Sequence, residues 1–473
     1  MTELHPNFAT VDSGALTWRQ EIGKLSIIAG PLAASYLAEM GMAISDLAIV
    51  GRIGAIELAA VGLVTTILYG VLFVIMSIAS VVGVFAAHSH GAGDRAQVSN
   101  AIGQGFWVAT GLSIPVMVFG WYLADLLPWL GQDQAVVDAA RPYAHGVTWS
   151  ILPYMWFSVQ RAFASALGRT QSIMAITLLA LALNFLLVLL LVYGIGDWPG
   201  LGLLGAGLGT STVCWLMFAA QSVVLARAPV FRGYGLLRAS VRFDALLNLR
   251  IVKMGVPVGV MTAVEAGLFA TVQIMMGIVG PVALAANQMV LNFTSFLYMI
   301  PAAIAQAAAV RVALERGAGR LAVARQGGFV AIGLNVGYMT MVMVFLLIFP
   351  QAVIHLYLDA ADPANAAVIA LAGQLMVFTA LFQIVDGMQV AVVNALRGLE
   401  DTTVPSIIGI FGYWGLGFVS GYILCFEMGM GPVGLLLGLA MGLAVTALLL
   451  TWRYHRHTRS YIGVLRAPAA GSP

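Results

Sequence analysis

The chain has 473 residues, of which 61% are hydrophobic and 9% charged, and its mean hydropathy is +0.95. Soluble domains carry about 25% charged residues, so this composition excludes a soluble globular protein and predicts an integral membrane protein. The formal net charge of +2 says little about partners, since the position of each charge is more informative. Both cysteines, Cys214 and Cys425, fall inside apolar segments, which argues against a disulfide framework or a thiolate metal site.

Twelve apolar segments are each long enough to cross a bilayer, which takes about 20 residues in a helix. They cover residues 24–51, 57–87, 97–123, 136–160, 172–195, 201–226, 250–279, 283–311, 327–350, 364–394, 403–425 and 432–453. So many spans leave little chain for a soluble domain. We therefore expect an all-α polytopic membrane protein with twelve transmembrane helices.

Lysine and arginine are unevenly divided between the expected loops. Arg52 and Arg141 fall on one side of the membrane, and the other 20 fall on the side that holds both chain ends. The positive-inside rule then predicts that both termini are cytoplasmic. The first twenty residues contain no apolar core before a cleavage site, so we expect no signal peptide.

The sequence repeats itself. Residues 24–54 align without a gap on residues 250–280, an offset of 226, which pairs Pro31 with Pro257 and Glu39 with Glu265. Later in each half, ALGRT at 166–170 aligns on GLEDT at 398–402, an offset of 232. Each copy holds six spans, and an even number gives both copies the same orientation, as in transporters with parallel repeats. Such transporters bind substrate between the halves and alternate access by moving one against the other.

The repeat predicts five regions. These are a cytoplasmic tail at 1–23, an N-terminal six-helix bundle at 24–226, a basic cytoplasmic linker at 227–249, a C-terminal six-helix bundle at 250–453 and a cytoplasmic tail at 454–473.

Four carboxylates lie inside the expected spans: Glu39, Asp46, Glu265 and Asp386. A charged group at the centre of a span costs roughly 2.5–3.5 kcal/mol, so it normally faces a partner, a cavity or an ion. Glu39 and Asp46 are seven residues apart, roughly 10 Å along one helix face, and could serve one cavity. A buried carboxylate without a fixed cation can exchange protons near neutral pH, and with neighbouring neutral oxygens it can bind Na⁺. The alternative, a neutral acid that only bonds a neighbouring helix, remains open, most of all for Glu39.

Uncharged polar groups accompany these acids. They are Gln383 and Gln389 beside Asp386, Gln288, Asn292 and Ser295 along the eighth span, Asn184 in the fifth span and Thr210 in the sixth. Such groups often do no more than link helices, at about 0.6 kcal/mol each. The seven histidines match no metal site, and no phosphate loop of the GxxxxGK[ST] type occurs, so nothing indicates an ATPase.

Four stretches together form a specific pattern. They are MGMAISDLAIVGRIGAIELAAVGL in spans one to two, GVPVGVMTAVEAGLF in span seven, LAANQMVLNFTSFLYMIPAAIAQAAAVRV in span eight and LFQIVDGMQVAVVNALRGLEDTT in spans ten to eleven. This pattern resembles the multidrug and toxic compound extrusion (MATE) family, and within it the bacterial NorM-type branch. The resemblance implies two pseudo-symmetric six-helix bundles and efflux of cationic, amphiphilic compounds in exchange for Na⁺ or H⁺.

The resemblance also implies roles for individual residues. Glu265 and Asp386 match the carboxylates that couple transport to a cation in the C-terminal lobe, and they are the candidate Na⁺ ligands. Asp46 matches the acid of the N-terminal lobe, and Asn184 and Thr210 match its polar companions.

Three positions depart from the family pattern. Phe382 stands where the NorM branch can carry a tyrosine; its ring can attract a cation but supplies no hydroxyl ligand. Val188 replaces a second asparagine, and Glu39 stands where glutamine is usual among relatives. These departures shift the expectation modestly from Na⁺ towards H⁺, and the coupling ion stays open.

We therefore expect a secondary antiporter of the bacterial inner membrane that needs no cofactor, is not an enzyme and works as a monomer. Its expected partners are organic cations and the lipid bilayer, with no nucleic acid. One alternative is a lipid-linked oligosaccharide flippase, which would need a basic central cavity, whereas the expected spans hold almost no lysine or arginine. A second is an intramembrane aspartate protease built on Asp46 and Asp386, although neither lies in a protease-like motif.

Overall fold

The computed structural model describes residues 17–235, 242–359 and 362–466, and these residues form a helical protein. Within those ranges the β pairing is limited to an isolated bridge between Ile195 and Trp198. Eleven helices of the described chain are long and apolar enough to cross a membrane. The expected all-α polytopic fold is confirmed.

The helices of the N-terminal half follow the expected spans closely. They are α1 (Trp18–Val50), α2 (Ala55–Ala79), α3 (Val81–Gly91), α4 (Arg95–Leu126), α5 (Gln134–Thr148), α6 (Ile151–Ala166), α7 (Gln171–Tyr193) and α8 (Leu203–Arg227). A single turn, η1 (Leu127–Leu130), follows α4, and the short helix α9 (Pro229–Arg232) follows α8.

The C-terminal half repeats this order. Its helices are α11 (Ala245–Val279), α12 (Pro281–Gly317), α13 (Leu321–Ile348), α14 (Pro350–Ile354), α15 (Ala366–Gly398), α16 (Thr403–Ile410), α17 (Val419–Tyr422) and α18 (Pro432–Arg466). The turn η2 (Pro363–Asn365) precedes α15, and the wider π-helical segments η3 (Phe411–Phe418) and η4 (Ile423–Glu427) complete the eleventh expected span.

The difference between eleven helices and twelve expected spans lies at residues 136–160. The chain there forms two helices, α5 and α6, which are separated by a turn at Trp149 and Ser150. Each is shorter than the eighteen residues that define a candidate span. Pro153, in the first turn of α6, has no N–H to continue the hydrogen bonding of α5, which is a physical reason for the break.

Local sequence explains where several helices begin. Thr17 and Gln20 form a reciprocal capping box at the start of α1, and the Asp94 and Asp244 side chains accept backbone N–H groups at the starts of α4 and α11. Gly280 has a φ of 151°, which favours glycine and allows the sharp turn between α11 and α12.

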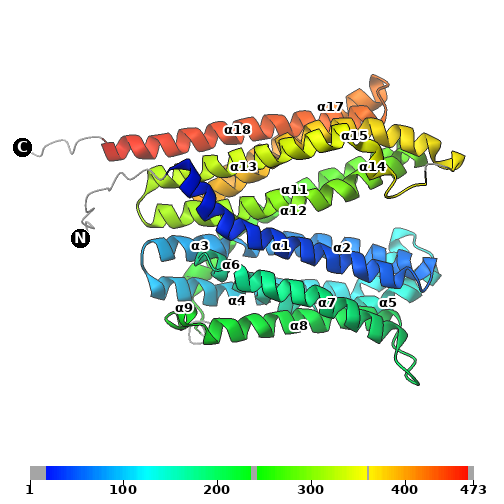
Figure 1. Ribbon diagram of the computed structural model, residues 1–473, viewed down its shortest axis with the longest axis horizontal. Helices are drawn as coiled ribbons and strands as arrows, with labels where there is room; N and C mark the ends of the chain where they lie inside the picture. The colour runs from blue at the N-terminus through cyan, green and yellow to red at the C-terminus, as the bar shows by residue number, and fades with distance from the viewer. Residues whose placement is uncertain (1–16, 236–241, 360–361, 467–473) are drawn as a thin grey trace, which may run out of the picture.

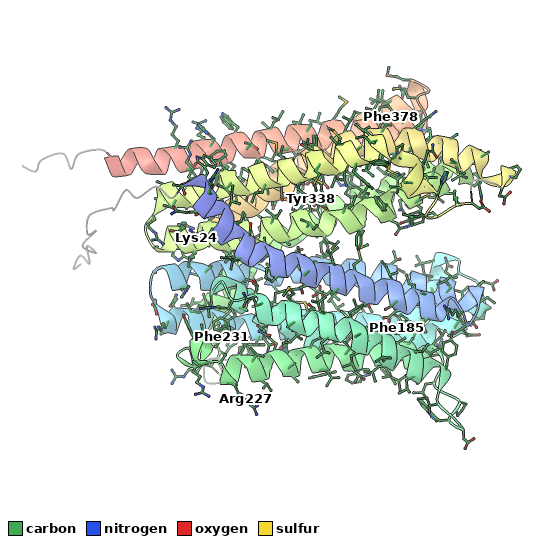
Figure 2. The ribbon with its side chains drawn as sticks, viewed as in Figure 1. Lys24, Phe185, Arg227, Phe231, Tyr338 and Phe378 are labelled. Carbon is green, nitrogen blue, oxygen red and sulfur yellow. The ribbon has the colours of Figure 1, made fainter. Side chains whose placement is uncertain are left out.

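The two halves form two bundles that lie side by side, with α1–α8 in one and α11–α18 in the other (Figure 1). We call them the N-lobe and the C-lobe. Helix α1 begins beside the C-lobe, where it contacts α12 and α13, and then crosses to the N-lobe, where it packs on α7. It starts at the same end of the molecule at which α18 finishes, and Lys24 and Arg227 lie towards that end (Figure 2).

The lobes touch along α2, α3, α11 and α12. A Cβ added to Gly317 would collide with the His88 carbonyl oxygen, and one added to Gly255 would collide with Ile78, so the backbones approach closely. One buried apolar cluster runs from α12 into the N-lobe. These contacts lie nearer the end where α1 begins than the end where α2 begins (Figure 1). The interface is therefore closed on that side.

The segment between the lobes packs on α4 in its described parts. Gln104 of α4 donates to the Arg242 carbonyl oxygen at 2.6 Å and accepts the Asp244 N–H at 3.0 Å. Helix α11 thus begins at Ala245, five residues before the expected span at 250. Part of the predicted linker, residues 236–241, lies outside the described residues, as do residues 1–16 and 467–473 of the predicted tails.

Candidate functional site

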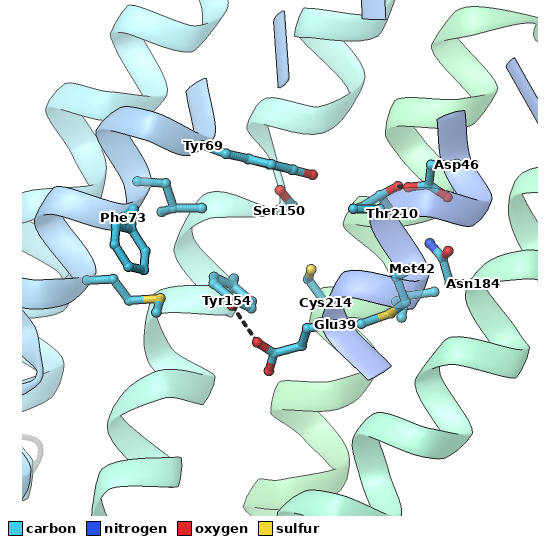
Figure 3. A pocket seen from close by; sticks show the side chains of 14 residues that line it. Glu39, Met42, Asp46, Tyr69, Phe73, Ser150, Tyr154, Asn184, Thr210 and Cys214 are labelled. Atoms are coloured by element: carbon cyan, nitrogen blue, oxygen red, sulfur yellow. Dashed lines mark hydrogen bonds between the residues drawn. The ribbon is translucent and has the colours of Figure 1, made fainter. Parts of the chain in front are cut away.

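The N-lobe contains a partly open cavity of about 220 Å³ between α1, α2, α6, α7 and α8 (Figure 3). Two acids, Glu39 and Asp46, lie on its α1 wall. The remaining wall is apolar, aromatic, sulfur-containing or neutral polar: Met42, Ala43, Tyr69, Leu72, Phe73, Met76, Ser150, Tyr154, Asn184, Thr210, Val213 and Cys214. The structure thus brings together four residues that the sequence singled out: Glu39, Asp46, Asn184 and Thr210.

Asp46 is a buried carboxylate with only part of its bonding capacity used. The Thr210 hydroxyl donates to Asp46 Oδ2 at 2.8 Å. The second oxygen, Oδ1, is buried and makes no hydrogen bond of normal length in the described chain, and the Asn184 amide lies beside Asp46 with its nitrogen likewise unpaired. A buried carboxylate oxygen without a partner is costly, so this position is suited to a proton or to a bound cation.

Glu39 has a different environment. Its Oε1 lies 2.6 Å from Arg161 Nη1, and the Tyr154 hydroxyl donates to its Oε2 at 2.9 Å. Arg161 falls just beyond the expected span 136–160, but it lies within α6 and is buried. Glu39 therefore has the fixed cation that Asp46 lacks.

Glu265 of α11 and Asp386 of α15 both lie in the C-lobe, and the negative charge of Asp386 acts on Glu265. Asp386 Oδ1 is buried without a hydrogen-bond partner, and no ion pair to either carboxylate occurs in the described chain. Two acids in one lobe, one of them with an unpartnered oxygen, are suited to a bound Na⁺ or a proton, since either would reduce the negative charge there.

The predicted companions of this acid pair differ in placement. The Gln383 side chain is buried near Asp386, and its amide nitrogen has no partner among the described residues. Phe382 packs edge-on against Phe269, with ring centroids 6.4 Å apart, as part of an apolar cluster. Gln288 accepts a hydrogen bond of 2.6 Å from Gln273 on α11, and Asn292 donates to the Gln288 carbonyl oxygen. The first of these two bonds links α11 to α12, and the second lies within α12.

Comparison with known proteins identifies the family. The family model described as MatE matches residues 31–190 and 257–423, well over half of the chain. The chain belongs to the MATE family.

The most similar relatives include a multidrug resistance protein NorM of Burkholderia vietnamiensis, which is 36% identical over 93% of this chain and 95% of its own length. A probable multidrug resistance protein NorM of Brucella suis biovar 1 is 32% identical over 94% of this chain and 95% of its own. The predicted resemblance to the NorM-type branch is thereby confirmed.

Solved MATE structures share the fold. An outward-facing multidrug resistance MATE transporter matches with a TM-score of 0.84 and 16% identity, over 96% of this chain and 99% of its own. A eukaryotic MATE transporter matches with a TM-score of 0.81 and 21% identity, over 94% and 99%. At these identities the likeness concerns the arrangement of helices, and it agrees with two bundles of a MATE protein.

Two residues of this MATE chain were missed from the sequence: Tyr154 and Arg161. Tyr154 was findable, because at the 232-residue offset of the later repeat it is the counterpart of Asp386. Because Glu39 is the counterpart of Glu265, the contact between Tyr154 and Glu39 joins the counterparts of the two C-lobe acids. Arg161 could have been suspected only by extending the fourth span beyond residue 160.

Proposed function

We propose that this chain is a secondary multidrug antiporter that exports cationic, amphiphilic compounds in exchange for Na⁺ or H⁺. Its multi-pass MATE fold and its NorM relatives, which are named as multidrug resistance proteins, support drug efflux. The observation that carries the ion coupling is that each lobe buries a carboxylate oxygen without a partner, at Asp46 and at Asp386.

The mechanism follows from neutralising these acids. In the arrangement described, cations enter at Glu265 and Asp386, or protons at Asp46, from the side opposite the lobe contacts. Binding removes buried charge, which stabilises a second arrangement of the lobes and releases the drug from its acidic partner. The coupling role predicted for Glu39 remains a prediction, and its ion pair with Arg161 favours a positioning role instead.

The membrane orientation remains part of the proposal. Lys24 and Arg227 lie towards the end where the lobes pack together. If that end faces the cytoplasm of a bacterial inner membrane, both termini are cytoplasmic and the closed side of the interface faces inward. The known relatives give no reason to require a cofactor or a second subunit, so we propose that a monomer transports.

The alternatives are less well supported. The flippase requires a basic cavity, whereas the N-lobe cavity is lined by Glu39, Asp46 and otherwise uncharged side chains, and Arg161 is already paired with Glu39. The relatives are transporters by name, which does not favour the protease. Asp46 and Asp386 lie in different lobes, so they do not form the facing pair that an aspartate protease needs.

The proposal predicts the effect of Glu265→Gln and Asp386→Asn. Each removes an acid that the coupling cation neutralises, so efflux driven by the coupling gradient falls at least tenfold, which corresponds to about 1.4 kcal/mol. The measurement is efflux of a fluorescent organic cation from proteoliposomes, with Na⁺ and pH gradients imposed separately.

Asp138→Asn is a matched control, because Asp138 is an exposed acid on α5 that bonds only Gln134 in the described chain. It should transport like the unmodified protein. Unchanged ion-driven transport in both C-lobe variants, with normal expression, would contradict coupling at this pair. A folded protein that moves no cation under either gradient would reject the substrate class.

A further inference from the structure

The N-lobe cavity has two carboxylates on its wall but only one uncompensated charge. Glu39 and Asp46 both line it. Asp46 accepts a hydrogen bond from the neutral Thr210 hydroxyl, whereas Glu39 is paired with the charged Arg161 guanidinium. The sum of the charges on these three side chains is therefore −1 when both acids are ionised.

Arg161 is held firmly in this position. Its side chain is 7% exposed and that of Glu39 is 15% exposed, so little water competes with the ion pair. The guanidinium carbon lies 5.1 Å from the Tyr36 ring centroid and 5.9 Å from that of Phe157. Both rings attract a cation. A buried arginine fixed on two aromatic faces is a permanent charge, in contrast to a mobile surface lysine.

The C-lobe lacks this arrangement. At the offset of the later repeat, the counterpart of Arg161 is Val393, and the counterpart of Tyr154 is the acid Asp386. No arginine pairs with Glu265 or Asp386 in the part of the chain that the structure describes. Both acids of the C-lobe thus lack an ion-pair partner among the described residues, whereas in the N-lobe Arg161 pairs with Glu39, one of the two acids.

We propose that Arg161 determines the charge specificity of the N-lobe cavity: by neutralising Glu39 it leaves Asp46 as the only free negative charge, and so matches the cavity to compounds with one positive charge. This inference rests on the proposed function as a cation exporter. A substrate with a second positive charge finds no free acid near Glu39 and meets the Arg161 charge instead. Specificity of this kind uses a repulsive group as well as an attractive one.

Ethidium and propidium provide a matched pair of probes, because they share one chromophore and carry one and two positive charges. Both become fluorescent on DNA, so proteoliposomes that enclose DNA report entry of either dye. The test compares the ratio of propidium to ethidium transport in the unmodified protein, Arg161→Gln, Glu39→Gln and the double variant.

Each variant has a distinct expected result. Arg161→Gln frees the Glu39 carboxylate, roughly 10 Å from Asp46 along α1, and at an effective dielectric constant of about 20 this raises the ratio about tenfold. Glu39→Gln leaves Arg161 unpaired and lowers transport of both dyes, propidium more strongly. The double variant removes both charges and returns the ratio to that of the unmodified protein. If Arg161 were only structural, Arg161→Gln would lower the transport rates of both dyes together, and the added Glu39→Gln change would not restore them.

An unchanged ratio in folded Arg161→Gln would overturn the inference. If that variant does not fold, Glu39→Gln decides, because transport of both dyes at normal rates in that variant would equally overturn it. Failure of the unmodified protein to move either dye under any gradient would instead reject the proposed function. Transport of ethidium with no change of ratio in any variant would leave that function intact and reject the role of Arg161 alone.

Discussion

At the scale of single residues, the partners of a buried acid decide what it can do. Glu39 and Asp46 are on the same helix and at the same cavity, yet one has an arginine and a tyrosine and the other has one threonine hydroxyl. An ion pair holds the Glu39 carboxylate in place, whereas the free oxygen of Asp46 can take a proton or a cation. Two carboxylates thus have different chemical capacities within about 10 Å on one helix.

Thr210→Val tests the hydrogen bond that the Thr210 hydroxyl donates to Asp46. Valine keeps the branched shape but removes the hydroxyl that donates to Asp46 Oδ2 at 2.8 Å. A hydrogen bond to a charged group contributes about 1.5–3 kcal/mol, so we expect ion-driven dye efflux to fall about tenfold or more at the same expression level.

Thr210→Ser is the control for this substitution, because it keeps the donor and should retain most of the activity. Equal activity of the valine and serine variants would show that the hydroxyl does not contribute to coupling.

At the scale of elements, side chains of the neighbouring helix α4 bond to the start of α11. Asp244 caps α11 by accepting the Leu247 N–H at 3.1 Å, and it accepts a second hydrogen bond from Asn100 on α4. These bonds hold the pKa of Asp244 below its usual range. The cap joins the first helix of the C-lobe to the N-lobe, so its protonation acts on a connection between lobes.

This cap predicts a pH dependence of stability. Because the pKa of Asp244 is depressed in the folded protein, its contribution is fully present above the unfolded pKa of about 3.9 and is lost as the pH falls through the lower folded value. Acidification from about pH 5 to about pH 3 should therefore cost the unmodified protein more thermal stability than it costs Asp244→Asn. The measurement is the unfolding temperature of both purified proteins across that range.

Asp133→Asn is a suitable comparison for Asp244→Asn. Asp133 also stands at a helix start, that of α5, but its side chain makes no capping bond there. Its replacement should leave the acid dependence unchanged. Parallel pH curves for the unmodified protein and Asp244→Asn would contradict the assigned role of the cap.

At the scale of the whole molecule, α1 belongs to one lobe but is anchored in both. Near its start, Glu21 receives two hydrogen bonds from Arg311 of α12, at 2.8 and 3.0 Å. Arg311 also pairs with Glu315, which in turn pairs with Arg320. Further along, Glu39 binds Arg161 of α6. Pro31 lies between the two anchors, where its missing backbone N–H removes one hydrogen bond of α1.

Arg311→Gln should therefore destabilise the protein strongly. The substitution leaves the buried carboxylates of Glu21 and Glu315 without this cation, and breaking a buried pair in this way costs about 3–5 kcal/mol. The free energy of unfolding can be measured by denaturant titration of the purified protein in mixed micelles.

Arg141→Gln is the matched control, because Arg141 pairs with Asp125 at 2.8 Å but both side chains are half-exposed. An exposed pair contributes about 1 kcal/mol at most. Equal losses from the two arginine substitutions would show that the Arg311 network is not a buried anchor.

The sequence by itself determined the fold class, the positions of the helices and the identity of the intramembrane acids. The reason is physical: the backbone of a membrane span must satisfy its hydrogen bonds within the helix, so apolar length alone marks the spans. A charged group in such a span is costly enough to stand out, as Asp46, Glu265 and Asp386 did. The two repeats were visible for the same reason, because each preserves spans and acids at fixed offsets.

Only the tertiary structure decided which acids are paired with an arginine. Arg161 is 122 residues from Glu39 along the chain, and Arg311 is 290 residues from Glu21. No local pattern links such pairs. The break between α5 and α6 was also hidden, because hydropathy does not report a turn. Hydropathy depends on each residue's own side chain, whereas the charge of a cavity depends on which distant helices pack around it.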